Sequence, residues 1–98
     1  MSYALVHSTS FKADLRRVAA RDPWRIDDLV AALEAASLLL RRFPELGHPV
    51  QIKGAWSMTR RSWRIGETGY LIRYTLQHEK KRIVLTRFRH QAQRPLKR

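Results

Sequence analysis

The spacing of apolar residues changes part-way along the chain, from the period of a helix to the period of a strand. Apolar residues at helical spacing fill two stretches, 11–19 and 26–40. Hydroxyl residues 8–10 precede the first stretch and can cap a helix there. Asp22 and Pro23 separate the two stretches, since aspartate favours the N-cap and proline the first helical position. The pattern predicts two amphipathic helices joined as an antiparallel hairpin.

Beyond Gly54 apolar and polar residues alternate, which is typical of half-buried strands. Three strands are predicted in this half, and one short strand is predicted before the first helix: residues 56–65, 70–76, 82–90 and 3–7. The stretch 44–54 contains proline and glycine and is interpreted as a linker. The predicted order of elements is therefore β-α-α-β-β-β.

The number of residues limits how these elements can pack. A chain of 98 residues builds one core, so residues 1–98 are predicted to form a single domain. A sheet must bury its apolar face, and the helical hairpin is the only cover that this chain offers. We therefore predict an α+β fold, with the hairpin packed on one face of a small, mostly antiparallel sheet and the other face left open.

The two-residue period of the last strand decides which of its side chains reach the open face. If Phe88 points into the core, Arg87 and Arg89 point to the open face. A regular strand also places Val84 in the core with Phe88, and it places Leu85 beside the arginines. The open face is thus predicted to carry a set of arginine side chains.

Positive charge is concentrated in this strand-rich half. The chain has a formal net charge of +12, and residues 51–98 contain 13 Lys and Arg against two Asp and Glu. Like charges gathered on one sheet repel one another unless an anionic partner neutralises them. Either these side chains bind a polyanion, or they form a solvated surface whose stems cover apolar neighbours. The predicted nucleic-acid-binding surface comprises Lys53, Arg60, Arg61, Arg64, Arg73, Arg87 and Arg89.

Composition excludes several other classes of site. The chain has no cysteine, which removes disulfides and cysteine-ligated zinc. The strand-rich half has only Glu67 and Glu79 as carboxylates, too few to hold magnesium, and the histidines lack metal-ligand spacing. We therefore expect no metal and no cofactor. We also expect a cytoplasmic protein with no membrane partner, because no apolar run reaches the ~18 residues of a membrane span and no signal peptide is recognisable.

His90 is the one side chain near the basic surface that can exchange a proton close to neutral pH. It is either a general acid or base, or a histidine at the end of a strand that hydrogen-bonds the scaffold. Without a metal, cleavage of RNA would use the 2′-hydroxyl of the RNA as nucleophile, and arginines would stabilise the charge that develops on the phosphate.

The segments FPELGHPV (43–50), GYLIRY (69–74) and IVLTRFRHQ (83–91) stand in an order and spacing that resembles the RelE/ParE superfamily of bacterial toxins. The resemblance extends over nearly the whole chain. It implies the toxin of a type II toxin–antitoxin pair, which a cognate antitoxin wraps and blocks with an extended or helical segment. RelE-like members cleave messenger RNA in the ribosomal A site without a metal, whereas ParE-like members poison DNA gyrase.

The resemblance also implies roles for individual residues. Many members carry an arginine directly after the tyrosine of the GY strand; here that position is Leu71, and Arg73 follows two residues later on the same face. Arg89 and His90 stand where many members have basic or imidazole side chains. The catalytic set implied is Arg73, Arg89 and His90, in which the arginines hold phosphates and the histidine moves a proton. Looser matches are Arg60 and Lys53.

Three functions are compatible with these observations. The first is a ribosome-dependent mRNA endoribonuclease that uses the open sheet face. The second is a gyrase inhibitor without catalytic activity, which would make its contacts through the helical hairpin or the tail. The third is a nucleic-acid-binding member without toxicity. For the antitoxin partner, the charge of the second half favours an acidic, partly disordered segment that folds on binding.

Overall fold

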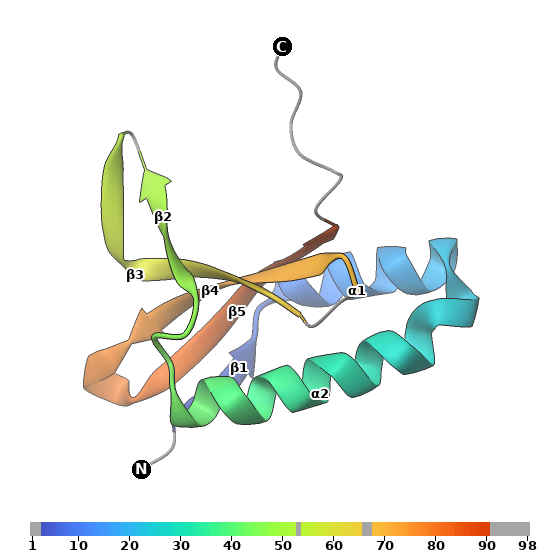
Figure 1. Ribbon diagram of the computed structural model, residues 1–98, viewed down its shortest axis with the longest axis horizontal. Coiled ribbons are helices and arrows are strands. Elements are labelled where there is room, and N and C mark those ends of the chain that lie inside the picture. The colour runs from blue at the N-terminus through green and yellow to red at the C-terminus, as the bar shows by residue number, and fades with distance from the viewer. Residues whose placement is uncertain (1–2, 53, 66–67, 91–98) are drawn as a thin grey trace.

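The computed structural model describes residues 3–52, 54–65 and 68–90, and it places them in a five-stranded sheet with two α-helices (Figure 1). The elements are β1 (Ala4–His7), α1 (Thr9–Arg21), the 3-10 turn η1 (Pro23–Arg25), α2 (Ile26–Arg42), β2 (His48–Ile52), β3 (Ala55–Arg64), β4 (Tyr70–Gln77), the 3-10 turn η2 (His78–Lys80) and β5 (Arg82–His90). The strand order is β1-β5-β4-β3-β2; β1 is parallel to β5, and the other neighbours are antiparallel. The predicted α+β class is confirmed.

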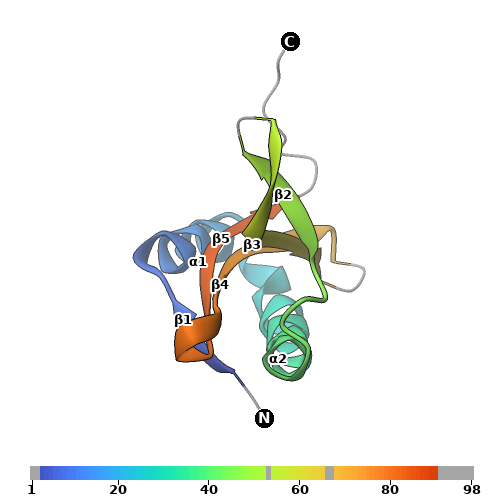
Figure 2. The same ribbon diagram turned by 90° about the vertical axis from the view of Figure 1, so that its left-hand side faces the viewer.

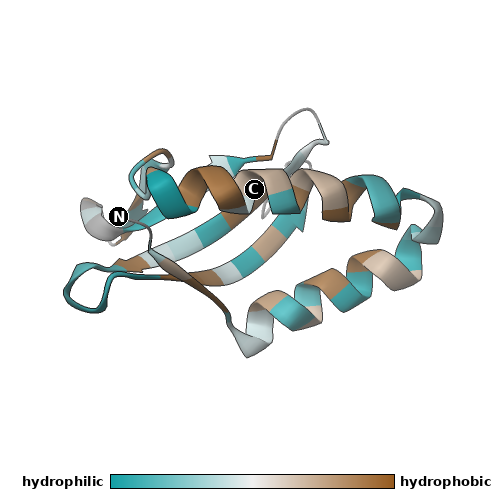
Figure 3. Ribbon diagram, turned by 90° about the horizontal axis from the view of Figure 1, so that it is seen from below, coloured by the Kyte–Doolittle hydropathy of each residue, from teal (hydrophilic) through white to brown (hydrophobic). Residues whose placement is uncertain are grey.

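Both helices cover the same face of the sheet. Seen from below, α2 passes in front of the strands and α1 lies beside them, and the two helices diverge from the turn that joins them (Figure 3). Aromatic rings connect α1 with the sheet, because Phe88 stacks on Tyr70 at 4.9 Å between ring centroids and meets Phe11 edge-on at 5.9 Å. The buried apolar residues form one cluster: Phe11, Val18, Leu29, Leu33, Ala36, Leu40, Ile65, Tyr70, Ile72, Tyr74, Leu76, Ile83, Leu85 and Phe88.

The helix boundaries follow the signals in the sequence, with one difference. Ser8 caps α1, since its Oγ accepts a hydrogen bond of 3.1 Å from the backbone N–H of Phe11. Asp22 and Pro23 end α1 as predicted, but they do not begin α2 directly. They open the turn η1, in which the side chain of Asp22 makes no capping hydrogen bond, and α2 begins three residues later at Ile26.

The predicted linker contains a strand that the sequence pattern did not indicate. Residues His48–Ile52 form β2, which pairs antiparallel with β3 and lies at the edge of the sheet. Pro49 lies within β2, and proline is tolerated in an edge strand because it has no N–H to offer to a second neighbour. The β2–β3 hairpin rises from the sheet on the side opposite α2, where it forms a wall (Figures 1 and 2).

A bulge in β5 changes which of its residues face the core. Arg73 pairs with Arg87, but the next residue of β4, Tyr74, pairs with Leu85, so Thr86 is left over. Leu85 and Phe88 are therefore both buried against the helices, and Val84 is not. The prediction that Val84 shares the core face with Phe88 was wrong, because it assumed a regular strand.

Two side chains of the sheet hold the loop after α2 in place through hydrogen bonds. The hydroxyl of Tyr74 donates to the carbonyl of Pro44 at 2.9 Å and accepts from the N–H of Gly47 at 2.8 Å. Arg61 donates to the carbonyls of Glu45 and Gly47. Burial raises the pKa of Tyr74, so its hydroxyl remains a neutral donor at physiological pH.

Candidate nucleic-acid interface

The strand register gathers arginines on the face of the sheet that the helices leave open. Arg73 lies opposite Arg87, and Leu71 lies between Arg64 on β3 and Arg89 on β5. Residues directly opposite one another share a face, so these side chains leave the sheet in the same direction. Arg60 follows on β3, opposite Thr75. The open face therefore carries Arg60, Arg64, Arg73, Arg87 and Arg89.

A cavity of about 360 Å³ lies on this face, which we call the open-face cavity. Its lining residues come from β2 and β3, whose hairpin is raised from the sheet (Figure 2), and from β4 and β5. Arginine guanidinium groups and small hydroxyl side chains supply its polar lining. The residues that line it are Val50, Gln51, Ile52, Arg60, Arg73, Tyr74, Thr75, Thr86 and Arg87.

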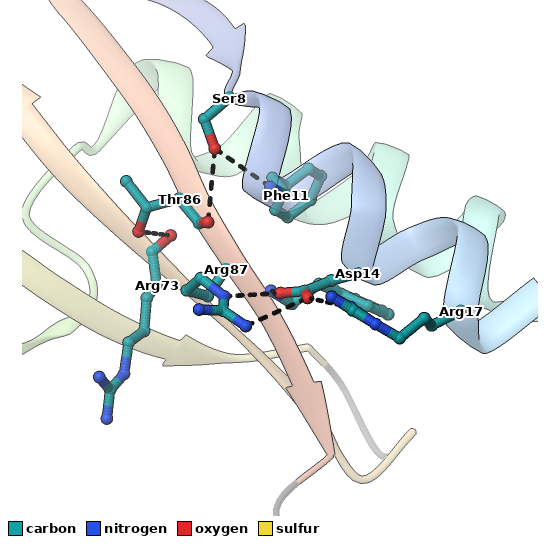
Figure 4. Close-up of polar contacts among 8 residues, drawn as sticks. Ser8, Phe11, Asp14, Arg17, Arg73, Thr86 and Arg87 are labelled. Carbon is teal, nitrogen blue, oxygen red and sulfur yellow. Dashed lines mark hydrogen bonds and ion pairs between the residues drawn. The ribbon is translucent and has the colours of Figure 1, made fainter.

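Arg73 and Arg87 start side by side, but their guanidinium groups point apart (Figure 4). Arg73 is exposed and makes no ion pair with any residue that the structure describes. The hydroxyl of Thr86, the bulge residue, donates to the backbone carbonyl of Arg73 at 3.0 Å and ties the two strands together. Arg87 turns towards α1 instead. Arg73 is therefore the arginine that is available to a ligand at the centre of the open face.

Asp14 of α1 holds Arg87 in place. Its carboxylate accepts hydrogen bonds from Nε of Arg87 at 2.9 Å and from Nη2 of Arg87 at 3.3 Å. Nη1 of Arg17 also lies 3.3 Å from this carboxylate. It also accepts the backbone N–H of Phe88 at 2.9 Å. Burial acts to raise the pKa of Asp14, but these donors and the two arginine charges outweigh burial and lower the pKa. The same contact raises the pKa of Arg87.

Asp14 was not predicted as a site residue, although its position in the sequence carries a signal. Asp14 lies three residues after Phe11 and four before Val18, so it occupies the apolar stripe of α1. It is only 6% exposed and is the one buried charged residue among those that the structure describes. A carboxylate on the buried stripe of a helix requires a partner on the facing strand, which here is Arg87.

Two of the predicted site residues lie away from the open face. Arg61 pairs with the core residue Tyr74, so it points to the helix side and binds the loop after α2. His90 pairs with Tyr70 and meets its ring edge-on at 4.9 Å between centroids, also on the helix side. The structure therefore brings Arg73 and Arg89 to one face but does not bring His90 to them. Lys53 lies outside the described residues.

The open face can stabilise negative charge, and its described part offers no carboxylate. His48 of β2 pairs with Ser62, which pairs with Arg73, so this register also places an imidazole on the open face. Arginine forms bidentate hydrogen bonds with phosphate and keeps its charge at any physiological pH. No group of three or more His, Asp and Glu residues in the described ranges could hold a metal ion. The geometry thus suits recognition of a chain of phosphates by guanidinium groups.

Comparison with known proteins identifies the family. Residues 5–95 match the model of the family described as "ParE toxin of type II toxin-antitoxin system, parDE". The chain belongs to the ParE toxin family. It is therefore a toxin of the RelE/ParE superfamily, as its sequence motifs indicated.

The fold of this toxin is also found in a solved toxin–antitoxin complex. A chain of the RelBE2 complex from Mycobacterium tuberculosis is 26% identical, with a TM-score of 0.69, and the match covers 92% of this toxin and 99% of that chain. No curated protein sequence that was compared with the toxin matches it. Within the described residues, neither α-helix has the length and apolar character needed to span a membrane.

Proposed function

We propose that the toxin arrests growth by binding messenger RNA on the open face, at the ribosome, and by promoting its cleavage without a metal. The observation that carries this proposal is the shared face of Arg60, Arg64, Arg73 and Arg89, which make no ion pair with any residue that the structure describes. Unpaired guanidinium groups on one sheet favour a polyanion, and RNA has a regular series of phosphates. The family match supports the assignment as a toxin, and the arrangement of charge supports RNA as its ligand.

In the proposed reaction the 2′-hydroxyl oxygen of the RNA attacks the adjacent phosphorus, and the bond from phosphorus to the 5′-oxygen breaks. The products are a 2′,3′-cyclic phosphate and a 5′-hydroxyl end. Arg73 and Arg89 hold the phosphate and stabilise the charge that develops on it. His90 lies on the helix side of β5, so in this proposal water accepts the proton of the 2′-hydroxyl and supplies the proton to the 5′-oxygen.

Charge reversal on the open face tests this function. We expect Arg73→Glu and Arg89→Glu each to abolish growth arrest and to lower transcript cleavage by about 100-fold or more, because a phosphate-stabilising donor becomes a repelling carboxylate. Lys80→Glu, on the exposed turn η2, changes the net charge equally and should leave both unchanged. Primer extension on transcripts after induction measures cleavage. Cleavage by the Arg73→Glu variant at the original rate would contradict the proposal.

Inhibition of DNA gyrase is the second candidate, and two observations favour it. Leu71 occupies the position where nuclease members of the superfamily carry arginine, and His90 lies away from the open face. An inhibitor of this kind needs no proton transfer. A supercoiling assay with purified gyrase, run beside primer extension, separates the two: gyrase inhibition with uncut transcripts would replace the nuclease function by this one.

The proposed antitoxin partner follows from the charge of the toxin. The open face is positive and has no carboxylate in its described part, so an acidic segment fits it and would compete with RNA. Such binding should weaken steeply as ionic strength rises, because exposed charges are screened.

A further inference from the structure

A second cavity lies beside the open face, between α1 and β5. Its volume is about 180 Å³, and we call it the edge cavity. Four of its seven lining residues are arginines, two from α1 and two from β5. The residues that line it are Asp14, Arg17, Val18, Arg21, Arg87, Phe88 and Arg89.

The edge cavity keeps a net positive charge after its internal ion pairs are counted. Asp14 is shared between Arg87 and Arg17, and Asp22 lies 3.6 Å from Nε of Arg21. Four arginines therefore line the cavity, and two carboxylates pair with them, of which only Asp14 lines the cavity itself. The side chains of Arg17 and Arg21 are 65% and 52% exposed, so both retain N–H groups that face solvent. An anion that enters the cavity would meet donors from both sides.

Two backbone groups of β5 beside this cavity are already satisfied, which restricts the kind of partner. β1 pairs with β5 only as far as Leu85. Beyond that point the hydroxyl of Ser8 donates to the carbonyl of Thr86 at 3.4 Å, and the N–H of Phe88 donates to Asp14. A peptide strand would find these two groups occupied by side chains. The cavity is therefore suited to recognition of charge rather than to strand addition.

Two arginines connect the edge cavity with the open face. Arg87 lines both the edge cavity and the open-face cavity. Arg89 lies on the open face opposite Leu71 and also lines the edge cavity. A ligand with one isolated charge needs only one of the two cavities. A ligand with charges repeated along a chain can occupy both without leaving the guanidinium groups.

We infer that the edge cavity is a second phosphate subsite, which holds a backbone phosphate of the same RNA strand that lies on the open face. This inference rests on the proposed RNA-binding function. Arg17 and Arg21 bind that phosphate from α1, Arg89 binds it from β5, and Asp14 keeps Arg87 oriented at the junction. The subsite contributes affinity without base preference, because it contacts the backbone alone.

Binding of a single-stranded RNA oligonucleotide to the full chain tests the subsite, with fluorescence anisotropy as the readout over a series of salt concentrations. We expect the double variant Arg17→Ala and Arg21→Ala to bind about tenfold more weakly at low salt. The slope of log affinity against log salt should fall by about 0.7 for each phosphate that is no longer neutralised. The weakening should be the same for oligonucleotides of different sequence. Arg16→Ala, on the exposed side of α1, is the matched control and should bind like the original protein.

Further outcomes separate the subsite from the function on which it rests. Unchanged affinity and salt slope in the double variant, with binding lost in Arg73→Glu, would overturn the edge subsite and leave the open-face function in place. Weakened binding in the double variant, with unchanged binding in Arg73→Glu, would overturn the open-face function and keep a phosphate site at the edge. If the double variant binds RNA normally but loses affinity for an acidic antitoxin peptide, the cavity belongs to the antitoxin and the inference fails. Thermal unfolding of each variant verifies that the fold is intact.

Discussion

Replacing Asp14 with alanine is expected to lower the free energy of unfolding by about 2–3 kcal/mol, measured by urea denaturation at pH 7. The substitution removes the acceptor of the backbone N–H of Phe88 and the carboxylate that holds Arg87. The N–H then lies at a buried position without its partner. Because the side chain of Arg87 is 38% exposed, its charge can be hydrated after the substitution, which keeps the expected cost below that of a fully buried pair.

Arg17→Ala is the control for this result. Arg17 contacts the same carboxylate, but its side chain is 65% exposed and its removal leaves Asp14 with its other donors. The expected cost is below about 1 kcal/mol, as for other surface ion pairs. Equal costs for Asp14→Ala and Arg17→Ala would show that the buried hydrogen bonds of Asp14 contribute little to stability.

The contribution of Asp14 should also depend on pH in a defined direction. Its pKa is lower in the folded state than the ordinary value of 3.8, so unfolding is accompanied by proton uptake at acidic pH. The stabilisation is therefore complete above pH 3.8 and is lost as pH falls through the lowered pKa of the folded protein. The difference in stability between the original protein and Asp14→Ala should shrink over that acidic range. A difference that stays constant would contradict the lowered pKa.

Replacing Gly47 with alanine is expected to cost about 2 kcal/mol, within the range for overpacking a well-packed site. A Cβ atom at this position would lie 2.6 Å from the hydroxyl oxygen of Tyr74 and 2.8 Å from the carbonyl oxygen of Ser62. The clash displaces the hydroxyl that joins the carbonyl of Pro44 to the N–H of Gly47. Urea denaturation measures the decrease in stability.

A double-mutant cycle with Tyr74→Phe gives this prediction a sharper test. Removing the hydroxyl removes the nearest clashing atom and leaves the carbonyl oxygen of Ser62 at 2.8 Å and the ring carbon Cε1 of residue 74 at 3.0 Å. Gly47→Ala should therefore cost less in the Tyr74→Phe background than in the original protein, so the two substitutions are not additive. Strict additivity would mean that the hydroxyl of Tyr74 does not limit the space at Gly47.

The regular elements were predictable because their signals are local. The apolar stripes of α1 and α2 and the alternation from Tyr70 to Leu76 need no tertiary information. β2 was missed because its pattern is short and contains Pro49, and only pairing with β3 makes it a strand. The bulge at Thr86 was missed because a single unpaired residue leaves no mark in the pattern of apolar residues, yet it reverses the faces of Val84 and Leu85.

The candidate site was predictable to the extent that it depends on alternation. Arg73, Arg87 and Arg89 lie on the open face as the two-residue period indicated. Arg61 and His90 each lie one position from an open-face arginine, and one position in a strand is the difference between its two sides. The contact between Asp14 and Arg87 joins residues 73 positions apart. Spacing alone could not identify Arg87 as the partner of Asp14. The place of Asp14 on the buried stripe indicated only that its carboxylate needs a partner.

The hydrogen bonds from Phe88 to Asp14 and from Ser8 to Thr86 have a consequence for how copies of the toxin behave at high concentration. A bare strand at the margin of a sheet invites a second molecule to extend the sheet, and repeated extension leads to insoluble fibres. Here two backbone groups of that margin, the carbonyl of Thr86 and the N–H of Phe88, already pair with side chains of the molecule itself. Removing Asp14 leaves the N–H of Phe88 without its partner, so we expect Asp14→Ala to aggregate more readily at high concentration as well as to unfold more easily.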